Sequence, residues 1–308
     1  MYRILLIDDD RNVLSALRRE LQSDYAIEAF DDPHQALQCC RESRFDLAIV
    51  DYKMPEMNGV EFLRQFVKLQ PDAIPIMLSG EADFGAIIGT INEAHIYRFI
   101  GKPWDSAELA ATLAEGLAHR EQLLENRRLA EACRKQQPWV GARNPDKLYQ
   151  VLMVDDEANM LNALARDLTM RGGYADLQMA LMSQANPESP ALHRDFRFNV
   201  VTTTSPLQAL ERARLATYDV VISDYLMPEM DGLSFLEAFR AIQPDAARIL
   251  LSGHTDKEVL VKAINSLKIY GYIGKPWHEY TLRTVVAQAI VHHELLRENR
   301  RLAEHAGG

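Results

Sequence analysis

The chain of 308 residues has few cysteines, no long apolar run and no excess of basic residues. Its three cysteines, Cys39, Cys40 and Cys133, are too few for a disulfide framework or a zinc site. No run of 18 apolar residues occurs, which argues against a membrane-spanning helix. Lysine and arginine number 34 against 44 aspartates and glutamates, a net charge of −10, so neither nucleic acid nor an anionic membrane is an expected partner.

The amino terminus also lacks the features of a secretion signal. Its apolar stretch, residues 2–7, is short and is followed directly by Asp8, Asp9 and Asp10. A signal peptide needs a basic start, a longer apolar run and a cleavage site of small residues, so we expect a cytoplasmic protein. The length and the 47% hydrophobic content suit two globular domains of about 150 residues each.

The sequence contains two copies of one pattern. Residues 51–63 recur as residues 224–236, with nine of the 13 positions identical. The motifs LSG and IGKPW recur at the same separation of 173 positions. Asp155, in contrast, lies 147 positions after Asp8, so the second copy carries 26 additional residues between its first two motifs. The chain is therefore a tandem duplication with one insertion.

Each copy alternates short apolar runs with helical patterns. This alternation predicts five strands and five helices per copy, and therefore a doubly wound α/β fold with a parallel sheet and helices on both faces. In such sheets the carboxyl ends of the strands form the ligand crevice. In the first copy the residues at these strand ends are Asp8, Asp9, Asp51, Ser79 and Lys102.

These residues together suggest a chemistry that none of them suggests alone. A single aspartate at a strand end often caps the next helix, and Lys-Pro is often only a turn. Three carboxylates that converge in one crevice, however, repel one another unless a cation lies among them. Mg²⁺ suits such a site because it takes oxygen ligands and needs few carboxylates. A carboxylate beside Mg²⁺ and a lysine can then take part in phosphoryl transfer.

Together the motifs resemble the receiver domain of two-component response regulators. The matching pieces are Asp-Asp after the first strand, Asp-x-x-Met-Pro-x-Met-x-Gly after the third, Ser-Gly after the fourth and Lys-Pro after the fifth. The resemblance covers residues 1–120 and 149–295. It implies two flavodoxin-like receiver domains in tandem, each a five-stranded parallel sheet with the strand order 2-1-3-4-5.

The resemblance also implies which residues accept phosphate and bind metal. Asp51 and Asp224 would accept a phosphoryl group from a histidine of a sensor kinase or a histidine phosphotransfer protein. One Mg²⁺ per receiver, replaceable by Mn²⁺, would be bound by carboxylates and one backbone carbonyl. The implied residues are Asp8, Asp9, Asp51 and the carbonyl of Lys53 in the first copy, and Asp155, Asp156, Asp224 and the carbonyl of Leu226 in the second. Asp9 and Asp156 would bind the ion directly, and Asp8 and Asp155 would act through water.

Three further positions would complete a switch. The lysine after the fifth strand would pair with a phosphoryl oxygen, and the peptide bond that follows it would be cis. The serine after the fourth strand would bond to the phosphoryl group, and the aromatic residue three positions before the lysine would turn inward. The face formed by the fourth helix, fifth strand and fifth helix would change with them. These residues are Lys102 and Lys275, Ser79 and Ser252, and Phe99 and Tyr272.

The two copies differ at the positions that, in this family, flank the path of the hydrolytic water. Lys53 and Glu81 occupy them in the first copy, and Leu226 and His254 occupy them in the second. We therefore expect the two phosphoryl groups to decay at different rates. The alternative is neutral variation of the surface.

A helical pattern continues beyond each fifth helix and ends in the same seven residues, ENRRLAE. Two interpretations stay open: a dimerising or signal-transmitting helix, and a solvated helix end stabilised by Glu–Arg pairs. The predicted domains are a first receiver at 1–133, a linker at 134–148 and a second receiver at 149–308. The insertion, at about 172–199, is either a variable surface loop or a small β-hairpin extension.

The predicted function is signalling rather than enzymatic, beyond self-phosphorylation and self-dephosphorylation. An aspartyl-phosphate phosphatase of the dehalogenase type is disfavoured because neither first-strand motif reads Asp-x-Asp-x-Thr. Nothing after the second receiver could form a helix-turn-helix, so DNA binding is not expected. Two outputs stay open: protein contacts, such as dimerisation through the fifth helix and its tail, or an enzymatic output domain in a longer regulator.

Overall fold

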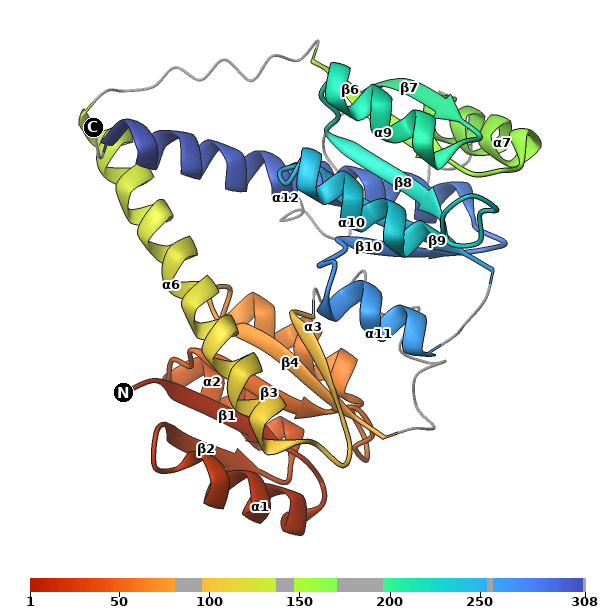
Figure 1. Ribbon diagram of the computed structural model, residues 1–308. Coiled ribbons are helices and arrows are strands. Elements are labelled where there is room, and N and C mark those ends of the chain that lie inside the picture. The colour runs from red at the N-terminus through yellow and green to blue at the C-terminus, as the bar shows by residue number, and fades with distance from the viewer. Residues whose placement is uncertain (81–95, 137–146, 171–195, 254–256, 307–308) are drawn as a thin grey trace. The chain divides into compact units, whose positions relative to one another are not determined.

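Two five-stranded parallel sheets, one in each half of the chain, organise the computed structural model (Figure 1). The structure describes residues 1–80, 96–136, 147–170, 196–253 and 257–306. The chain divides into two compact units, Met1–Asn126 and Arg127–Gly308. In the described part of the chain, no helix combines the length and the apolar character needed to cross a membrane. The predicted fold class, two doubly wound α/β domains in tandem, is confirmed.

The first sheet has the order β2-β1-β3-β4-β5, the one that the family resemblance implied. All four neighbouring pairs of strands are parallel. The elements in chain order are β1 (Arg3–Ile7), α1 (Arg11–Leu21), β2 (Ala26–Phe30), α2 (Pro33–Glu42), β3 (Leu47–Asp51), α3 (Gly59–Leu69), β4 (Ile74–Ser79), β5 (Arg98–Gly101) and α6 (Ser106–Gln136).

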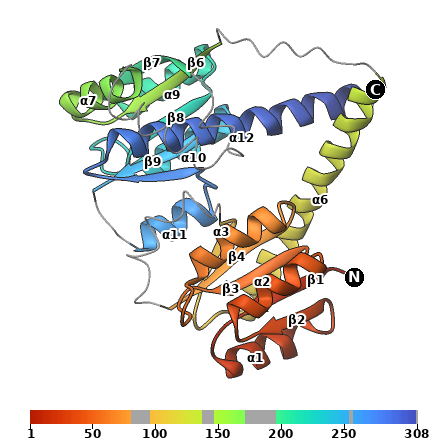
Figure 2. The same ribbon diagram turned by 180° about the vertical axis from the view of Figure 1, so that it is seen from behind.

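Helices cover both faces of this sheet (Figures 1 and 2). Leu14 and Leu17 of α1 and Leu109 and Leu113 of α6 share one buried core with residues from four of the strands. α2 and α3 pack together over the other face, where Phe62 is fully buried. Both faces of the sheet are therefore buried from solvent, which is why its strands are near-continuous apolar runs.

The second sheet repeats the first. Read from its β7 edge, the order is β7-β6-β8-β9-β10, again all parallel. Its elements are β6 (Leu148–Val154), α7 (Ala158–Thr169), β7 (Arg197–Thr203), α9 (Pro206–Leu215), β8 (Val220–Asp224), α10 (Gly232–Ile242), β9 (Ala247–Ser252), α11 (Lys257–Asn265), β10 (Gly271–Gly274) and α12 (Glu279–Ala306). α7 and α12 pack on one face and share a core with the sheet.

Three element boundaries differ from the expected ranges. α6 continues to Gln136, past the expected end of the first receiver at residue 133, and β6 begins at Leu148, inside the expected linker. Residues 197–199, the end of the expected insertion, belong to β7, because that strand pairs with β6 along its whole length and its apolar residues pack on the second core. Residues 197–203 thus form the edge strand of the second sheet. The rest of the insertion, 171–195, lies outside the described residues.

α6 and α12 are the longest helices described, with 31 and 28 residues. Both ENRRLAE segments are helical. The core cluster of the first sheet includes α6 residues up to Leu117, and that of the second sheet includes α12 residues up to Val291. Farther along α12, Asn299 and Leu302 are also buried. Each helix thus continues for several turns beyond the core of its own sheet.

Candidate functional site

Three carboxylates meet at the carboxyl edge of each sheet. Asp8 follows β1 and Asp51 ends β3, and these strands are neighbours with Ile7 paired to Val50. The carboxylate oxygens of Asp8, Asp9 and Asp51 lie within 4.8 Å of one another. Asp8 and Asp51 are buried, whereas Asp9 is exposed. The second copy brings Asp155, Asp156 and Asp224 together in the same way and with the same pattern of burial.

One lysine contacts two of the carboxylates in each copy. The Nζ atom of Lys102 lies 2.6 Å from Asp8 Oδ2 and 2.5 Å from Asp51 Oδ1. The Nζ atom of Lys275 lies 2.8 Å from Asp155 Oδ2 and 2.6 Å from Asp224 Oδ1. The loop after the fifth strand aims this side chain back across the sheet edge.

Backbone contacts fix the position of that loop. The Lys102 N–H donates to the Ser79 carbonyl at 3.0 Å, and the Lys275 N–H donates to the Ser252 carbonyl at 2.9 Å. The peptide bond after each lysine, to Pro103 or to Pro276, is cis, as the resemblance implied.

Burial sets the electrostatics of the site. It raises the pKa of the Asp8 carboxyl above its ordinary value, although hydrogen bonds from Lys102 and from the Asp10 backbone oppose the shift. Burial likewise raises the pKa of the Asp224 carboxyl against the opposing effect of Lys275. Burial alone would lower the pKa of Lys102, but its hydrogen bonds to Asp51 and Asp8 outweigh burial and raise that pKa.

The donor set fits a hard divalent cation. Three carboxylates face one ammonium in each copy, so negative charge remains in excess. Oxygen atoms from two buried carboxylates and one exposed carboxylate are ligands that Mg²⁺ accepts while it keeps several waters. The site can therefore concentrate positive charge next to a buried carboxylate oxygen, which phosphoryl transfer requires.

The loop after the third strand leaves no room for a side chain where it enters α3. A Cβ on Gly59 would lie 2.2 Å from the Asp51 carbonyl oxygen, and one on Gly232 would lie 2.1 Å from the Asp224 carbonyl oxygen. The Gly59 N–H also donates to the Tyr52 carbonyl at 2.8 Å. The glycine of the repeated motif therefore permits the close turn that holds the aspartate at the sheet edge.

The predicted switch residues lie next to this centre. Ser79 and Ser252 end β4 and β9, and both are buried. Phe99 and Tyr272 are buried in β5 and β10. The Tyr272 hydroxyl donates to the Ser252 carbonyl at 3.3 Å. Both aromatic residues are therefore buried in this structure, and their movement on phosphorylation stays a prediction.

Other predicted residues are only partly placed. The backbone N–H of Lys53 donates to Asp51 Oδ2 at 2.8 Å, and the N–H of Leu226 donates to Asp224 Oδ2 at 3.2 Å. The role of their carbonyl groups as metal ligands stays a prediction. Glu81 and His254 lie outside the described residues.

The sequence analysis assigned no role to the tryptophan of each Lys-Pro-Trp. The indole N–H of Trp104 donates to Glu20 of α1 at 3.1 Å, and that of Trp277 donates to Asp167 of α7 at 3.1 Å. Both contacts tie the lysine loop to the end of the first helix. The sequence did indicate that these two acids are equivalent, because Glu20 and Asp167 are separated by the same 147 positions as the first motifs of the two copies.

The chain matches a known family across most of its length. The model for the response regulator receiver domain matches residues 4–114 and 189–287, more than half of the chain. The hydrogenase transcriptional regulatory protein HoxA of Bradyrhizobium diazoefficiens is 32% identical over 114 residues, which are 37% of this chain and 24% of HoxA. The cyclic di-GMP phosphodiesterase response regulator RpfG of Xanthomonas campestris is 32% identical over 123 residues, which are 39% of this chain and 32% of RpfG.

A solved structure gives a similar match. The signal receiver domain of an HD domain-containing protein from Pseudomonas fluorescens Pf-5 is 34% identical, with a TM-score of 0.38, and the match covers 39% of this chain and 98% of that chain. The chain thus spans about a quarter of HoxA and about a third of RpfG. The match to the Pseudomonas fluorescens receiver domain, in contrast, covers nearly all of that domain.

Proposed function

Because the chain belongs to the response regulator receiver domain family, we propose that Asp51 and Asp224 each accept a phosphoryl group from a phosphohistidine. The observation that supports this best is the buried contact of each aspartate with a lysine and two further carboxylates. The donor would be a sensor histidine kinase or a histidine phosphotransfer protein. Each receiver would then act as a signalling module within a two-component system.

The proposed step is a displacement at phosphorus. A carboxylate oxygen of Asp51 or Asp224 forms the new P–O bond while the P–N bond to the donor histidine breaks, and the imidazole leaves. The ammonium of Lys102 or Lys275 stabilises negative charge on the transferring oxygens. Asp8, Asp9 and Asp51, with Asp155, Asp156 and Asp224 in the second receiver, would hold Mg²⁺, which supplies further positive charge there.

The acyl phosphate would change the surface through the serine and the aromatic residue. Ser252 and Tyr272 are joined through the Ser252 carbonyl, so a movement of β9 toward a phosphoryl group would reach the Tyr272 ring. β10, which carries that ring, pairs with β9 and contacts α12. The face of α11, β10 and α12 would therefore carry the output of the second receiver.

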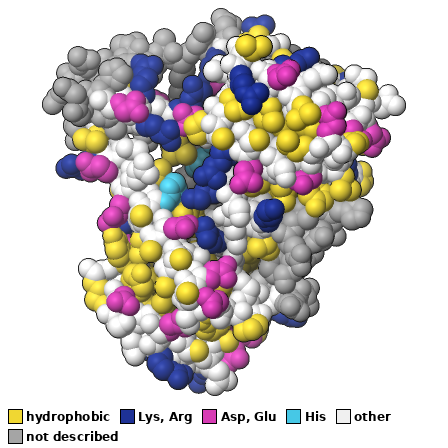
Figure 3. Space-filling view, viewed as in Figure 1, with side chains coloured by type: hydrophobic (Ala, Val, Ile, Leu, Met, Phe, Trp, Pro, Cys, Tyr) yellow, Lys and Arg dark blue, Asp and Glu magenta, His cyan; other side chains and the backbone are white. Residues whose placement is uncertain are grey.

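A protein partner suits the surface near the second site. Leu226, two positions after the phosphoacceptor, is 56% exposed, and Leu207 of α9 is 51% exposed. Apolar side chains are also visible over α9 and α10 in Figure 3. Exposed apolar surface of this kind is typical of protein interaction sites.

The output beyond the two receivers is open to two proposals. HoxA is a transcriptional regulatory protein and RpfG is a cyclic di-GMP phosphodiesterase response regulator, so this chain could form the receiver part of a longer regulator. Alternatively, the extended helices α6 and α12 could support dimerisation. Under both proposals the two receivers carry out only their own phosphorylation and dephosphorylation.

Intact mass after incubation with Mg²⁺ and acetyl phosphate tests the phosphoacceptor proposal. Wild type should gain two phosphoryl groups, Asp51→Ala and Asp224→Ala one each, and the double variant none. A gain of one group that only one of the two substitutions removes would restrict the function to one receiver. No gain, with acetyl phosphate or with a phosphohistidine donor, would refute the proposal.

A further inference from the structure

A tryptophan stands two positions after each lysine that contacts the carboxylates. In the first receiver, the indole N–H of Trp104 donates to Glu20 Oε2 of α1 at 3.1 Å. In the second, the indole N–H of Trp277 donates to Asp167 Oδ2 of α7 at 3.1 Å. Each ring also packs against the core of its own sheet. Glutamate is longer than aspartate by one methylene, so the two receivers make the same contact at the same distance with different acceptors.

The loop that carries the lysine is short and is held on both sides. Residues 102–105 connect the end of β5 to the start of α6. On the strand side, the Lys102 N–H donates to the Ser79 carbonyl at 3.0 Å. On the other side, the indole contact of Trp104 anchors the loop to α1. The second receiver repeats this arrangement with residues 275–278, so in both copies the indole contact limits how far the lysine backbone can move.

The ammonium depends on the position of that loop because its contacts are short. The Nζ atom of Lys102 lies 2.6 Å from Asp8 and 2.5 Å from Asp51, whereas hydrogen bonds weaken beyond about 3.2 Å. The lysine stem is flexible and does not hold the ammonium in place by itself. The Lys102 side chain is 23% exposed, while those of Asp8 and Asp51 are 1% and 5% exposed. If the loop moved, water could therefore take over the ammonium and leave the carboxylates buried.

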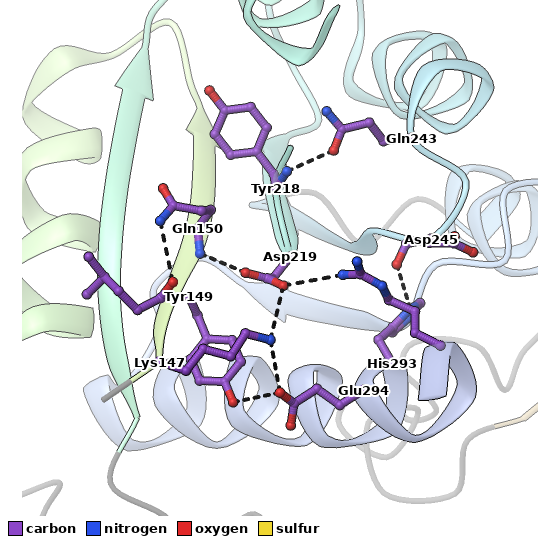
Figure 4. A network of polar contacts seen from close by, with 11 residues as sticks. Lys147, Tyr149, Gln150, Tyr218, Asp219, Gln243, Asp245, His293 and Glu294 are labelled. Atoms are coloured by element: carbon purple, nitrogen blue, oxygen red, sulfur yellow. Dashed lines mark hydrogen bonds and ion pairs between the residues drawn. The ribbon is translucent and has the colours of Figure 1, made fainter. Parts of the chain in front are cut away.

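A separate set of contacts holds the last helix at the opposite edge of the sheet (Figure 4). The Tyr149 hydroxyl donates to Glu294 of α12 at 2.8 Å, and the Nζ atom of Lys147 lies 3.0 Å from the same carboxylate. In the first receiver the Tyr2 hydroxyl donates to Glu121 of α6. These tyrosines lie near the amino ends of the first strands, away from the lysine loop. They therefore offer a matched control for the tryptophans.

We propose that the tryptophan of each receiver is a positioning residue for phosphoryl transfer. Its hydrogen bond to the first helix holds the lysine ammonium against the phosphoacceptor aspartate. The inference rests on the proposed phosphoacceptor function. Without this hydrogen bond the ammonium would spend less time between the carboxylates, so the transferring oxygens would meet less positive charge. Phosphorylation would then slow although every residue of the carboxylate–lysine cluster is still present. The positioning residues are Trp104 and Trp277.

The position of the lysine can be tested without Mg²⁺ or a phosphodonor, by reductive methylation of the full chain and peptide mass analysis. Methylation requires the unprotonated amine. Burial alone would lower the pKa of Lys102, but its hydrogen bonds to Asp51 and Asp8 raise that pKa and should protect the amine. Glu20→Leu removes the acceptor of the indole and should speed methylation of Lys102 by about two- to tenfold, the factor that one hydrogen bond contributes. Lys275 should react at the wild-type rate, because its own loop is unchanged.

Further variants separate the indole contact from other effects of the substitution. Glu20→Gln keeps an acceptor oxygen and should show methylation of Lys102 at close to the wild-type rate. The double variant Trp104→Phe/Glu20→Leu should react no faster than the faster single variant, because both substitutions remove the same contact. In the second receiver, Asp167→Leu should speed methylation of Lys275 and leave that of Lys102 unchanged.

Tyr2→Phe is the matched control in the first receiver. It removes a contact between the first strand and α6 at the other edge of the sheet, and it should leave methylation of Lys102 unchanged. Urea unfolding of each variant measures its loss of stability, so that Glu20→Leu and Tyr2→Phe can be compared. Unchanged methylation of Lys102 in Glu20→Leu, or equally faster methylation in Tyr2→Phe, would refute the positioning role.

The effect on phosphoryl transfer is measured in an Asp224→Ala background, as the rate at which acetyl phosphate modifies Asp51. Glu20→Leu should slow this reaction about three- to tenfold, less than the roughly 10²-fold cost of removing a charge-stabilising donor, while Glu20→Gln and Tyr2→Phe keep the rate of the parent protein. A parental rate in Glu20→Leu would refute the positioning role and leave the phosphoacceptor function intact. No phosphoryl group on the parent protein, with acetyl phosphate or with a phosphohistidine donor, would instead refute the proposed function of Asp51.

Discussion

Replacing Lys275 by methionine should destabilise the second receiver strongly when Mg²⁺ is absent. The ammonium lies 2.8 Å from Asp155 Oδ2 and 2.6 Å from Asp224 Oδ1, on carboxylates whose side chains are 0% and 7% exposed. Loss of one partner from a buried ion pair costs about 3–5 kcal/mol. The lysine side chain is itself 16% exposed, so water offsets part of that cost, and we expect a loss of about 2–4 kcal/mol in the free energy of unfolding.

Urea unfolding of the full chain, followed by circular dichroism with and without Mg²⁺, measures this loss. Mg²⁺ should stabilise Lys275→Met more than wild type, because the variant offers a more negative site and a ligand that binds only the folded state stabilises by mass action. Lys102→Met is the matched variant and should shift the unfolding of the first receiver instead. A loss below about 1 kcal/mol, the value of an exposed ion pair, or weaker stabilisation of the variant by Mg²⁺, would refute this electrostatic description of the site.

Three further predictions concern single groups. Burial raises the pKa of the Asp8 carboxyl in the folded state, so the folded protein gains stability as the pH falls from that raised pKa toward the ordinary value of 3.8. Asp8→Asn should therefore stabilise the Mg²⁺-free protein at neutral pH. Urea titrations should show the difference in stability between Asp8→Asn and wild type shrinking over the same pH range. Gly59→Ala should slow phosphorylation of Asp51 by more than about tenfold, because its Cβ would displace the Asp51 backbone, while intact mass shows Asp224 still modified at the wild-type rate. The acyl phosphates in Asp224→Ala and Asp51→Ala should decay at different rates, and equal decay times would favour neutral variation at Lys53 and Leu226.

The sequence was sufficient to predict the carboxylate–lysine cluster. Asp8, Asp51 and Lys102 follow strands that any right-handed parallel topology brings to one edge, and the repeat showed that both copies keep them. Their contact distances and the burial that raises the pKa of Asp8 depend on the packed sheet and required the structure.

Contacts between residues far apart in the sequence were not predictable in the same way. Lys147, Asp219 and Glu294 carry no shared motif, and only the fold brings the start of β6, the start of β8 and the middle of α12 together. The start of β7 at Arg197 could not be read from the sequence, because the alternation of Phe196, Arg197, Phe198 and Asn199 suits the end of a loop extension as well as the start of a strand.

Chemical trapping of the phosphorylated residues tests the central proposal most directly. Borohydride reduces an aspartyl phosphate to homoserine, so treatment of the acetyl-phosphate-labelled protein, followed by peptide mass analysis, identifies each acceptor. We expect homoserine at positions 51 and 224 and at no other aspartate, and only when Mg²⁺ is present. Homoserine at Asp8, Asp9, Asp155 or Asp156, or its absence from both expected positions, would contradict the assignment of Asp51 and Asp224 as the phosphoacceptors.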